Sequence, residues 1–264
     1  MNRNGATALG FHALFIAFML TPLLAVCVTA FTPESYLSVP FGDFSLRWFR
    51  ALLERADFRR ATWLSVRLAA LAATLAMAVA TPAALALARR RFIGREALGA
   101  LFMSPLTIPH VVLGIALLRY LAQIGMGATF HGLVVGHLLL VTPFALRLVL
   151  ASAAGMDERI HQAAISLGAG PIVTFRRVTL PLILPGIVSG WILAFIVSFD
   201  EVVMTVFLAA PGTETLPLRM LNHIQDTTDP LVAAMSAILI AGTALLALLL
   251  DRLHGLDRLL SGRG

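Results

Sequence analysis

Long apolar runs constrain the fold of this chain more than any other feature of its sequence. A helix needs about 20 apolar residues to cross a bilayer, and backbone groups in lipid must be paired within their own segment. Six runs meet this length: residues 8–30, 62–88, 98–121, 130–153, 186–210 and 231–250. The pattern predicts an all-α, polytopic membrane protein with six transmembrane helices in one domain, 1–264.

The distribution of arginine predicts the orientation of these helices. Positive residues gather in cytosolic loops, and Arg89, Arg90, Arg91 and Arg95 form the densest basic group. With that group inside, twelve arginines fall on inner segments and seven on outer ones. We therefore expect both termini in the cytosol, an external loop at 31–61 with an amphipathic helix near Ser45–Arg55, and a cytosolic loop at 154–185.

Composition excludes several classes of function. The chain is 59% hydrophobic and 13% charged, and all 20 of its Lys and Arg residues are Arg. Without lysine there is no Walker A phosphate loop, and the single Cys27 allows no internal disulfide. The histidines show no metal-ligand spacing, so we expect no metal, cofactor or catalytic residue. Most arginines lie between apolar runs, which indicates membrane orientation rather than nucleic-acid binding.

The cytosolic loop has its own local pattern. Ile160, Ala163, Ala164 and Leu167 share one helix face. Asp157 can cap this helix and Glu158 suits its dipole, while Gly168 and Gly170 offer left-handed positions that end it. Pro171 then fits the first turn of a second helix, and we expect Pro181 and Pro185 to break or kink the chain before the fifth apolar run.

The same residues resemble the "EAA" signature of permease subunits in bacterial ABC importers. The match consists of Gln162-Ala163-Ala164, Gly168-Ala169, Phe175, Val178, Leu180-Pro181 and Pro185-Gly186-Ile187. The resemblance implies a type I importer fold in the bacterial inner membrane, with a coupling helix that sits in a groove of the ATPase. The residues it assigns to ATPase coupling are Asp157, Glu158, Gln162, Ala163, Ala164, Gly168 and Ala169. Gln162 replaces the family's leading Glu, and the alternative is an ordinary interfacial helix.

Two acids in the fifth run suggest a pathway for the solute. Charged residues within a span are costly unless they meet water, a partner or a cavity. Asp200 and Glu201 are adjacent, so one can face the pathway while the other contacts a neighbouring helix or Arg67. An aromatic stripe at helical spacing, Trp191, Phe195 and Phe199, could bind an ammonium by cation–π contacts. The alternative is that the acids form structural ion pairs and the stripe packs between helices.

A wider resemblance, to the spermidine/putrescine class, includes Ser198 to Val203 and Leu216 to Met220. It implies a half-pore that works with a second permease, different or identical, two cytosolic ATPases and an external binding protein. Iron, opine and phosphonate permeases share much of the first segment, so the substrate stays open. An ion-coupled secondary transporter is the runner-up. An intramembrane hydrolase is disfavoured because Ser189 lacks a preceding glycine and a recognisable triad.

Overall fold

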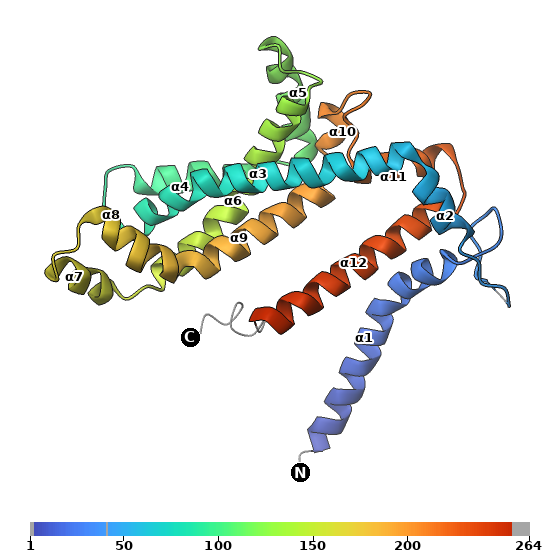
Figure 1. Ribbon diagram of the computed structural model, residues 1–264, viewed down its shortest axis with the longest axis horizontal. Coiled ribbons are helices and arrows are strands. Elements are labelled where there is room, and N and C mark those ends of the chain that lie inside the picture. The colour runs from blue at the N-terminus through green and yellow to red at the C-terminus, as the bar shows by residue number, and fades with distance from the viewer. Residues whose placement is uncertain (1–2, 41, 255–264) are drawn as a thin grey trace. The chain divides into compact units, whose positions relative to one another are not determined.

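The computed structural model describes residues 3–40 and 42–254, and over these residues the regular structure is entirely helical. The chain divides into two compact units. The first contains residues up to 59 and from 220, and the second contains residues 60–219 (Figure 1). The expected all-α fold is confirmed, while a single domain over 1–264 stays a prediction.

Within the described residues, four helices are long and apolar enough to cross a membrane. They are α1 (Arg3–Thr29), α3 (Ala56–Arg89), α6 (Phe130–Ala154) and the continuous helix from Pro171 to Asp200. A fifth candidate is broken, because α4 (Arg95–Met103) with η1 (Ser104–Thr107) meets α5 (His110–Gln123) at 104°. A sixth, α12 (Leu231–His254), qualifies only as a shorter apolar helix over Leu231–Leu245. The count of six therefore stays a prediction.

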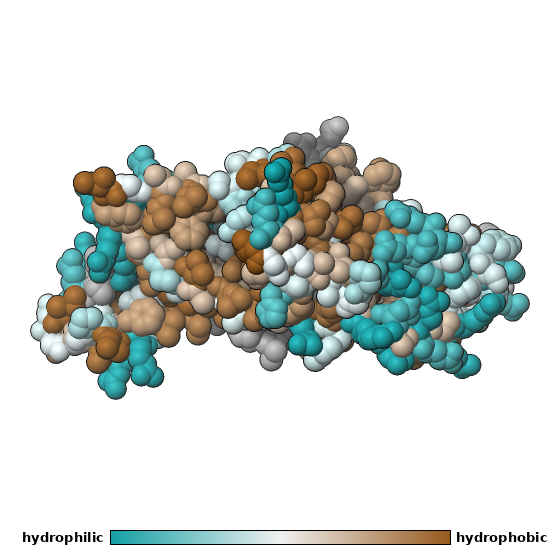
Figure 2. All heavy atoms as spheres, turned by 90° about the horizontal axis from the view of Figure 1, so that it is seen from above, coloured by the Kyte–Doolittle hydropathy of each residue, from teal (hydrophilic) through white to brown (hydrophobic). Residues whose placement is uncertain are grey.

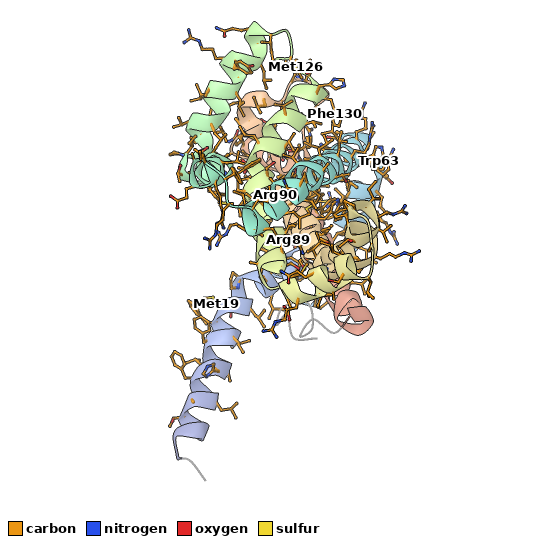
Figure 3. The ribbon with its side chains drawn as sticks, turned by 90° about the vertical axis from the view of Figure 1, so that its left-hand side faces the viewer. Met19, Trp63, Arg89, Arg90, Met126 and Phe130 are labelled. Atoms are coloured by element: carbon orange, nitrogen blue, oxygen red, sulfur yellow. The ribbon has the colours of Figure 1, made fainter. Side chains whose placement is uncertain are left out.

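The first unit contains α1, α2 (Arg47–Glu54) and α12. The apolar side chains of α1 are exposed, as Met19 illustrates (Figure 3), which suits a helix surrounded by lipid. The amphipathic helix expected near Ser45–Arg55 is confirmed as α2, which buries Trp48 and Leu52. Figure 2 shows apolar side chains over much of one face of the molecule.

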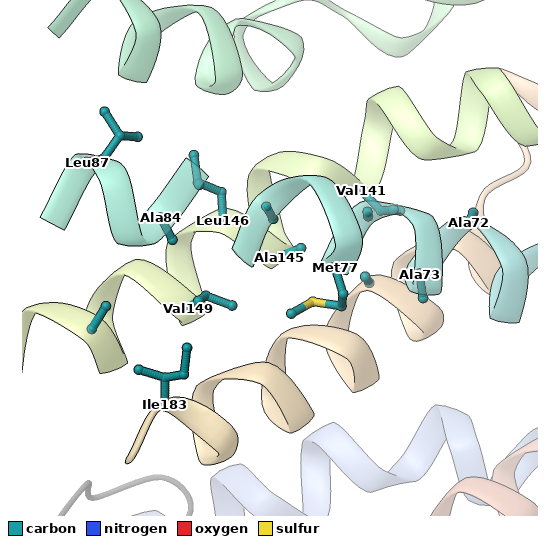
Figure 4. Close-up of a cluster of buried hydrophobic side chains, with 14 residues drawn as sticks. Ala72, Ala73, Met77, Ala84, Leu87, Val141, Ala145, Leu146, Val149 and Ile183 are labelled. Carbon is teal, nitrogen blue, oxygen red and sulfur yellow. The ribbon is translucent and has the colours of Figure 1, made fainter. Parts of the chain in front are cut away.

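The core of the second unit lies where α3, α6 and α9 (Leu180–Asp200) meet (Figure 4). Alanines of α3, including Ala72, Ala76 and Ala80, are fully buried there. A Cβ on Gly186 of α9 would lie 2.5 Å from Cβ of Ser152 in α6. Small residues thus let these helices approach closely, as is usual for helices packed within a membrane.

The broken span has a local cause. Ile108 is extended, with φ −93° and ψ 127°, as expected for a residue before proline. Pro109 then precedes the first residue of α5, and Pro105 lies in the first turn of η1. The prolines at 105 and 109 therefore redirect the chain.

Of the break or kink expected at Pro181 and Pro185, the break does not occur. The helix runs without interruption from α8 (Pro171–Thr174) through a π-helical turn, η2 (Phe175–Thr179), into α9. Proline at 181 has no N–H and its ring crowds the carbonyl four residues earlier, at Arg177. In the wider turn, Leu180 N–H bonds instead to the carbonyl of Phe175, so the chain accommodates the proline without ending the helix.

A further expectation, at the end of the fifth run, is wrong. That helix ends at Asp200 rather than Ala210, and a short helix, α10 (Thr205–Leu208), follows it. The next segment, 211–229, contains α11 (Leu216–Asp226). A short turn among apolar residues is invisible to hydropathy, because the run stays apolar on both sides of the break.

Candidate functional site

The loop at 154–185, expected in the cytosol, begins with a helix that has defined ends, α7 (Glu158–Ser166). Oδ1 of Asp157 accepts the N–H of Arg159 at 2.9 Å, so the expected cap is confirmed. At the other end Gly168 has φ +82°, and its N–H and that of Ala169 bond to the carbonyls of Ile165 and Ala164. This pair of bonds is the Schellman motif, which ends a helix at a left-handed residue.

Gly170 does not share this conformation, contrary to expectation. Its φ is −69° and its ψ is 165°, an extended conformation that other residues also adopt. It is the N-cap of α8, which begins at Pro171 as expected. One glycine, Gly168, therefore makes the turn.

Several apolar side chains of the loop are exposed. The largest exposed fractions belong to Leu167, at 88%, Ile172, at 75%, and Ile165, at 55%. The residues assigned to coupling differ in accessibility: Asp157, Gln162, Ala163 and Gly168 are exposed, and Ala164 and Ala169 are half-buried. Glu158 begins α7, but its side chain lies outside the described part of the structure. A helix at the end of the second unit (Figure 1) thus presents apolar and small residues suited to a protein partner.

Arg89, the last residue of α3, forms hydrogen bonds to both ends of this loop. Its guanidinium donates to the hydroxyl of Thr179 at 3.4 Å and to the sulfur of Met156 at 3.5 Å. Met156 precedes α7 and Thr179 ends the π-turn. The loop therefore enters and leaves against one transmembrane helix.

A second candidate site surrounds Glu201, the residue that follows α9. Its side chain is 6% exposed, and Oε2 lies 3.0 Å from Nδ1 of His110 at the start of α5. Oε1 accepts the N–H of Met204 at 2.7 Å. A carboxylate is disfavoured at a helix C-terminus, but here it also caps the turn that leads into α10. It therefore joins the end of α9 to the bend of the broken span.

A buried histidine on α6 supports the same turn. The hydroxyl of Thr205 donates to the carbonyl of Glu201 at 3.0 Å, which uses its one proton. Its oxygen must then accept from Nε2 of His137 at 3.0 Å, and Nδ1 of the same ring lies 2.8 Å from the hydroxyl oxygen of Ser198. This network places a proton on Nε2 of His137.

Two further charged residues considered from the sequence, Asp200 and Arg67, have different surroundings. Asp200 is exposed, whereas Arg67 lies over the ring of Phe130 at 5.7 Å. Glu201 pairs with His110 at the start of α5, which is a contact with a neighbouring helix rather than with Arg67. Among the described residues, no group of three acidic, Cys or His side chains is placed to hold a metal ion.

The aromatic stripe is a stacked ladder on α9. Trp191 and Phe195 stack with centroids 5.4 Å apart, and Phe195 and Phe199 with centroids 6.0 Å apart. The indole N–H of Trp191 donates to Thr74 at 3.0 Å. All three side chains are half-buried, so each ring is partly accessible from one side.

Comparison with known proteins identifies the family. Residues 80–256 match the family described as the binding-protein-dependent transport system inner membrane component. The chain belongs to this family. It is therefore a multi-pass permease subunit of an ABC importer and not an enzyme, and the alternatives of a secondary transporter and a hydrolase are excluded.

Curated relatives of the chain have different named substrates. PotC of Haemophilus influenzae, a spermidine/putrescine transport system permease protein, is 31% identical over 85% of this chain and 87% of its own length. PotI of Escherichia coli K12, a putrescine transport system permease protein, is 31% identical over 86% of this chain and 83% of its own length. ModB of Mycobacterium bovis, a molybdenum transport system permease protein, is 34% identical over 88% of both.

Solved structures share the fold. An ABC transporter involved in the import of alginate superposes with a TM-score of 0.73 at 13% identity, over 96% of this chain and 99% of that one. The MetNI methionine transporter superposes with a TM-score of 0.62 at 18% identity, over 74% of this chain and 93% of that one. The expected type I importer fold is thereby confirmed.

The partners in the second site were not predicted from sequence. The sequence alone does not connect His110 with Glu201, or His137 with Ser198 and Thr205. The sequence does carry a local signal that His110 lies in a polar environment. It follows the second of two closely spaced prolines, where the start of a helix leaves backbone groups without partners in the helix, and polar side chains can bond to them. Nothing local pairs it with an acid 91 residues later.

We expect the Glu201 contacts to contribute to stability. Glu201→Ala leaves the N–H of Met204 and the ring of His110 without a partner, at a cost of about 1–3 kcal/mol. The matched change at the exposed neighbour, Asp200→Ala, should stay within about 0.5 kcal/mol. Thermal unfolding of the purified protein in detergent measures both, and equal melting temperatures would show that the contacts do not stabilise the fold.

Proposed function

We propose that this permease forms half of the pathway for a polyamine-like cation in a binding-protein-dependent importer. The observation that carries the proposal is the Glu201 site, a carboxylate beside a half-exposed His110 at the break of a span. The names of PotC and PotI support the substrate class. The stacked rings of Trp191, Phe195 and Phe199 on the same helix add surfaces that attract an ammonium.

The proposed complex has further components of three kinds. Two cytosolic ATPases dock on α7 and its counterpart, a second permease completes the pore, and an external binding protein delivers the solute. The resemblance of the loop to the EAA signature supports the first of these, and the family description supports the last. The second permease is either a different chain or a second copy of this one.

The proposed mechanism uses the continuity of one helix. The 30-residue helix from Pro171 to Asp200 begins beside α7 and ends directly before Glu201. At 1.5 Å per residue it spans about 45 Å. Movement imposed on α7 by ATPase closure therefore reaches the carboxylate through a rigid element, and Arg89 carries the same movement to α3.

Cysteine labelling tests the proposed orientation. The arginine bias places both termini and α7 in the cytosol; of the arginines counted in the C-terminal tail, Arg258 and Arg263 lie outside the described residues. In a Cys27→Ala background, Ala163→Cys should react with a membrane-impermeant maleimide only from the cytosolic face and Ala56→Cys only from the outer face. The reverse pattern would overturn the topology.

Coupling is tested at Gly168. The change Gly168→Val places a β-branched side chain at φ +82°, which costs about 1–2 kcal/mol, so the Schellman turn should distort. We expect insertion to survive while substrate-stimulated ATP hydrolysis and uptake both fall. The matched control is Gly170→Val, because that position is already extended and a Cβ there has no atom within 4 Å. Full ATPase assembly and normal coupling in Gly168→Val would contradict the proposal.

The pathway is tested with amides that preserve shape. In Glu201→Gln the side chain can still accept from Met204 and donate to His110, but it has no charge. We expect uptake of a polyamine by the assembled transporter to fall about tenfold, equivalent to about 1.4 kcal/mol. Asp200→Asn tests the exposed acid in the same assay. Unchanged uptake in both variants would remove the acids from the pathway.

The similarity to ModB supports a second candidate substrate, a molybdenum-containing anion. An anionic solute would gain nothing from the carboxylate of Glu201. Uptake of spermidine and of molybdate by the same reconstituted transporter and its binding protein separates the two, because only a cation should lose transport in Glu201→Gln.

A further inference from the structure

Two adjoining cavities lie on the first unit, where the end of α1 meets α2. One has a volume of about 460 Å³ and an almost wholly apolar lining: Cys27, Val28, Phe31, Phe44, Ser45 and Leu46. The other, of about 600 Å³, is lined by Phe44, Ser45, Leu46, Arg47, Arg50, Ala51 and Glu54. Phe44, Ser45 and Leu46 line both, so the two cavities adjoin along this segment. Together they are called the groove, with an apolar part and a basic part.

The walls of this groove are held firmly. The N–H of Ser45 donates to the carbonyl of Phe31 at 2.8 Å, which closes the loop between α1 and α2. The ring of Phe31 packs against that of Phe49 with centroids 5.0 Å apart. The indole N–H of Trp48 donates to the carbonyl of Glu34 at 3.1 Å. The groove is therefore a shaped feature of the unit.

The two arginines are placed to bind an anion. The guanidinium of Arg47 lies 4.9 Å from the ring centroid of Trp48 and donates to the carbonyl of Pro33 at 3.2 Å, which orients it and leaves further N–H groups available. Arg50 follows one turn later and is exposed. Glu54 is the acid of this lining, and it forms no ion pair with Arg50 among the described residues. The basic part thus carries a net charge of about +1.

The surroundings indicate what kind of molecule fits. The apolar part continues directly from α1, whose exposed apolar side chains face hydrocarbon in a membrane. An amphipathic helix with basic residues on its polar face, such as α2, lies at the level of the headgroups. A ligand here therefore meets hydrocarbon at one end and arginine at the other.

We propose that this groove binds one anionic phospholipid, with an acyl chain beside Cys27 and the phosphate between Arg47 and Arg50. Arginine suits this contact because its planar guanidinium binds phosphate through paired hydrogen bonds. A bound lipid would fill the space between α1 and α2 and fix their spacing at the membrane surface.

The chain's one cysteine provides a direct test, because Cys27 lines the apolar part. The rate at which N-ethylmaleimide modifies Cys27 is measured by mass spectrometry in the complete, detergent-solubilised transporter. Phosphatidylglycerol should slow this reaction at concentrations at least about tenfold lower than phosphatidylcholine with the same acyl chains, a preference expected from two arginines. Inorganic phosphate alone should not slow it, since it has no acyl chain.

Variants locate the headgroup. Each arginine near an anionic lipid contributes about a fivefold gain in binding, so Arg50→Gln should require about fivefold more phosphatidylglycerol for the same protection. The double variant Arg47→Gln with Arg50→Gln should require about 25-fold more. Arg119→Gln, an exposed arginine on α5, is the matched control and should behave as wild type.

Three results would overturn the proposal. Equal protection by the two lipids would show an unselective hydrophobic surface, and wild-type protection in the double variant would remove the arginines from the site. A Cys27 that stays unreactive in transporter shown by native mass spectrometry to carry no phosphatidylglycerol would mean that another subunit covers the groove.

Discussion

The need to pair every backbone polar group inside an apolar environment shapes this molecule. Helices meet that need along most of their length, and the polar chemistry lies where they stop. At the end of α9, the carboxylate of Glu201 accepts a hydrogen bond from the N–H of Met204. The hydroxyl of Thr205 donates to the backbone carbonyl of Glu201, and its oxygen is hydrogen-bonded to Nε2 of His137. A helix break among transmembrane elements thus requires polar side chains to pair the backbone groups that the break leaves free.

Local features of the fold were predictable from sequence and distant ones were not. The cap at Asp157, the left-handed Gly168 and the helix start at Pro171 each depend on a few neighbouring residues. The stacked ladder follows from the helical spacing of Trp191, Phe195 and Phe199. Each of these features depends only on residues close together in the chain. The long helices are predicted in addition from the hydropathy of the sequence.

The second site could not be predicted because its contacts join residues far apart in the chain. His137 lies 61 residues from Ser198 and 68 from Thr205, and no periodicity connects them. The end of α9 was missed for another reason: the residues after Asp200 remain apolar, so the apolar run hides the turn before α10. Burial of a turn is a tertiary property, and it is decided by the close packing of Met204 and Phe207 against Gly114.

The π-turn at Phe175–Thr179 has a consequence for how the chain can vary in length. Each residue added to an α-helix rotates everything beyond it by about 100°. A π-turn accommodates one extra residue within a single wide turn, so the helix beyond it keeps the phase it would have without that residue. Loss of one residue there would leave Gly186 and Ala194 facing the same neighbours, whereas loss of one within α9 would turn them away. The π-turn is thus a place where the chain can lose one residue without repacking the core.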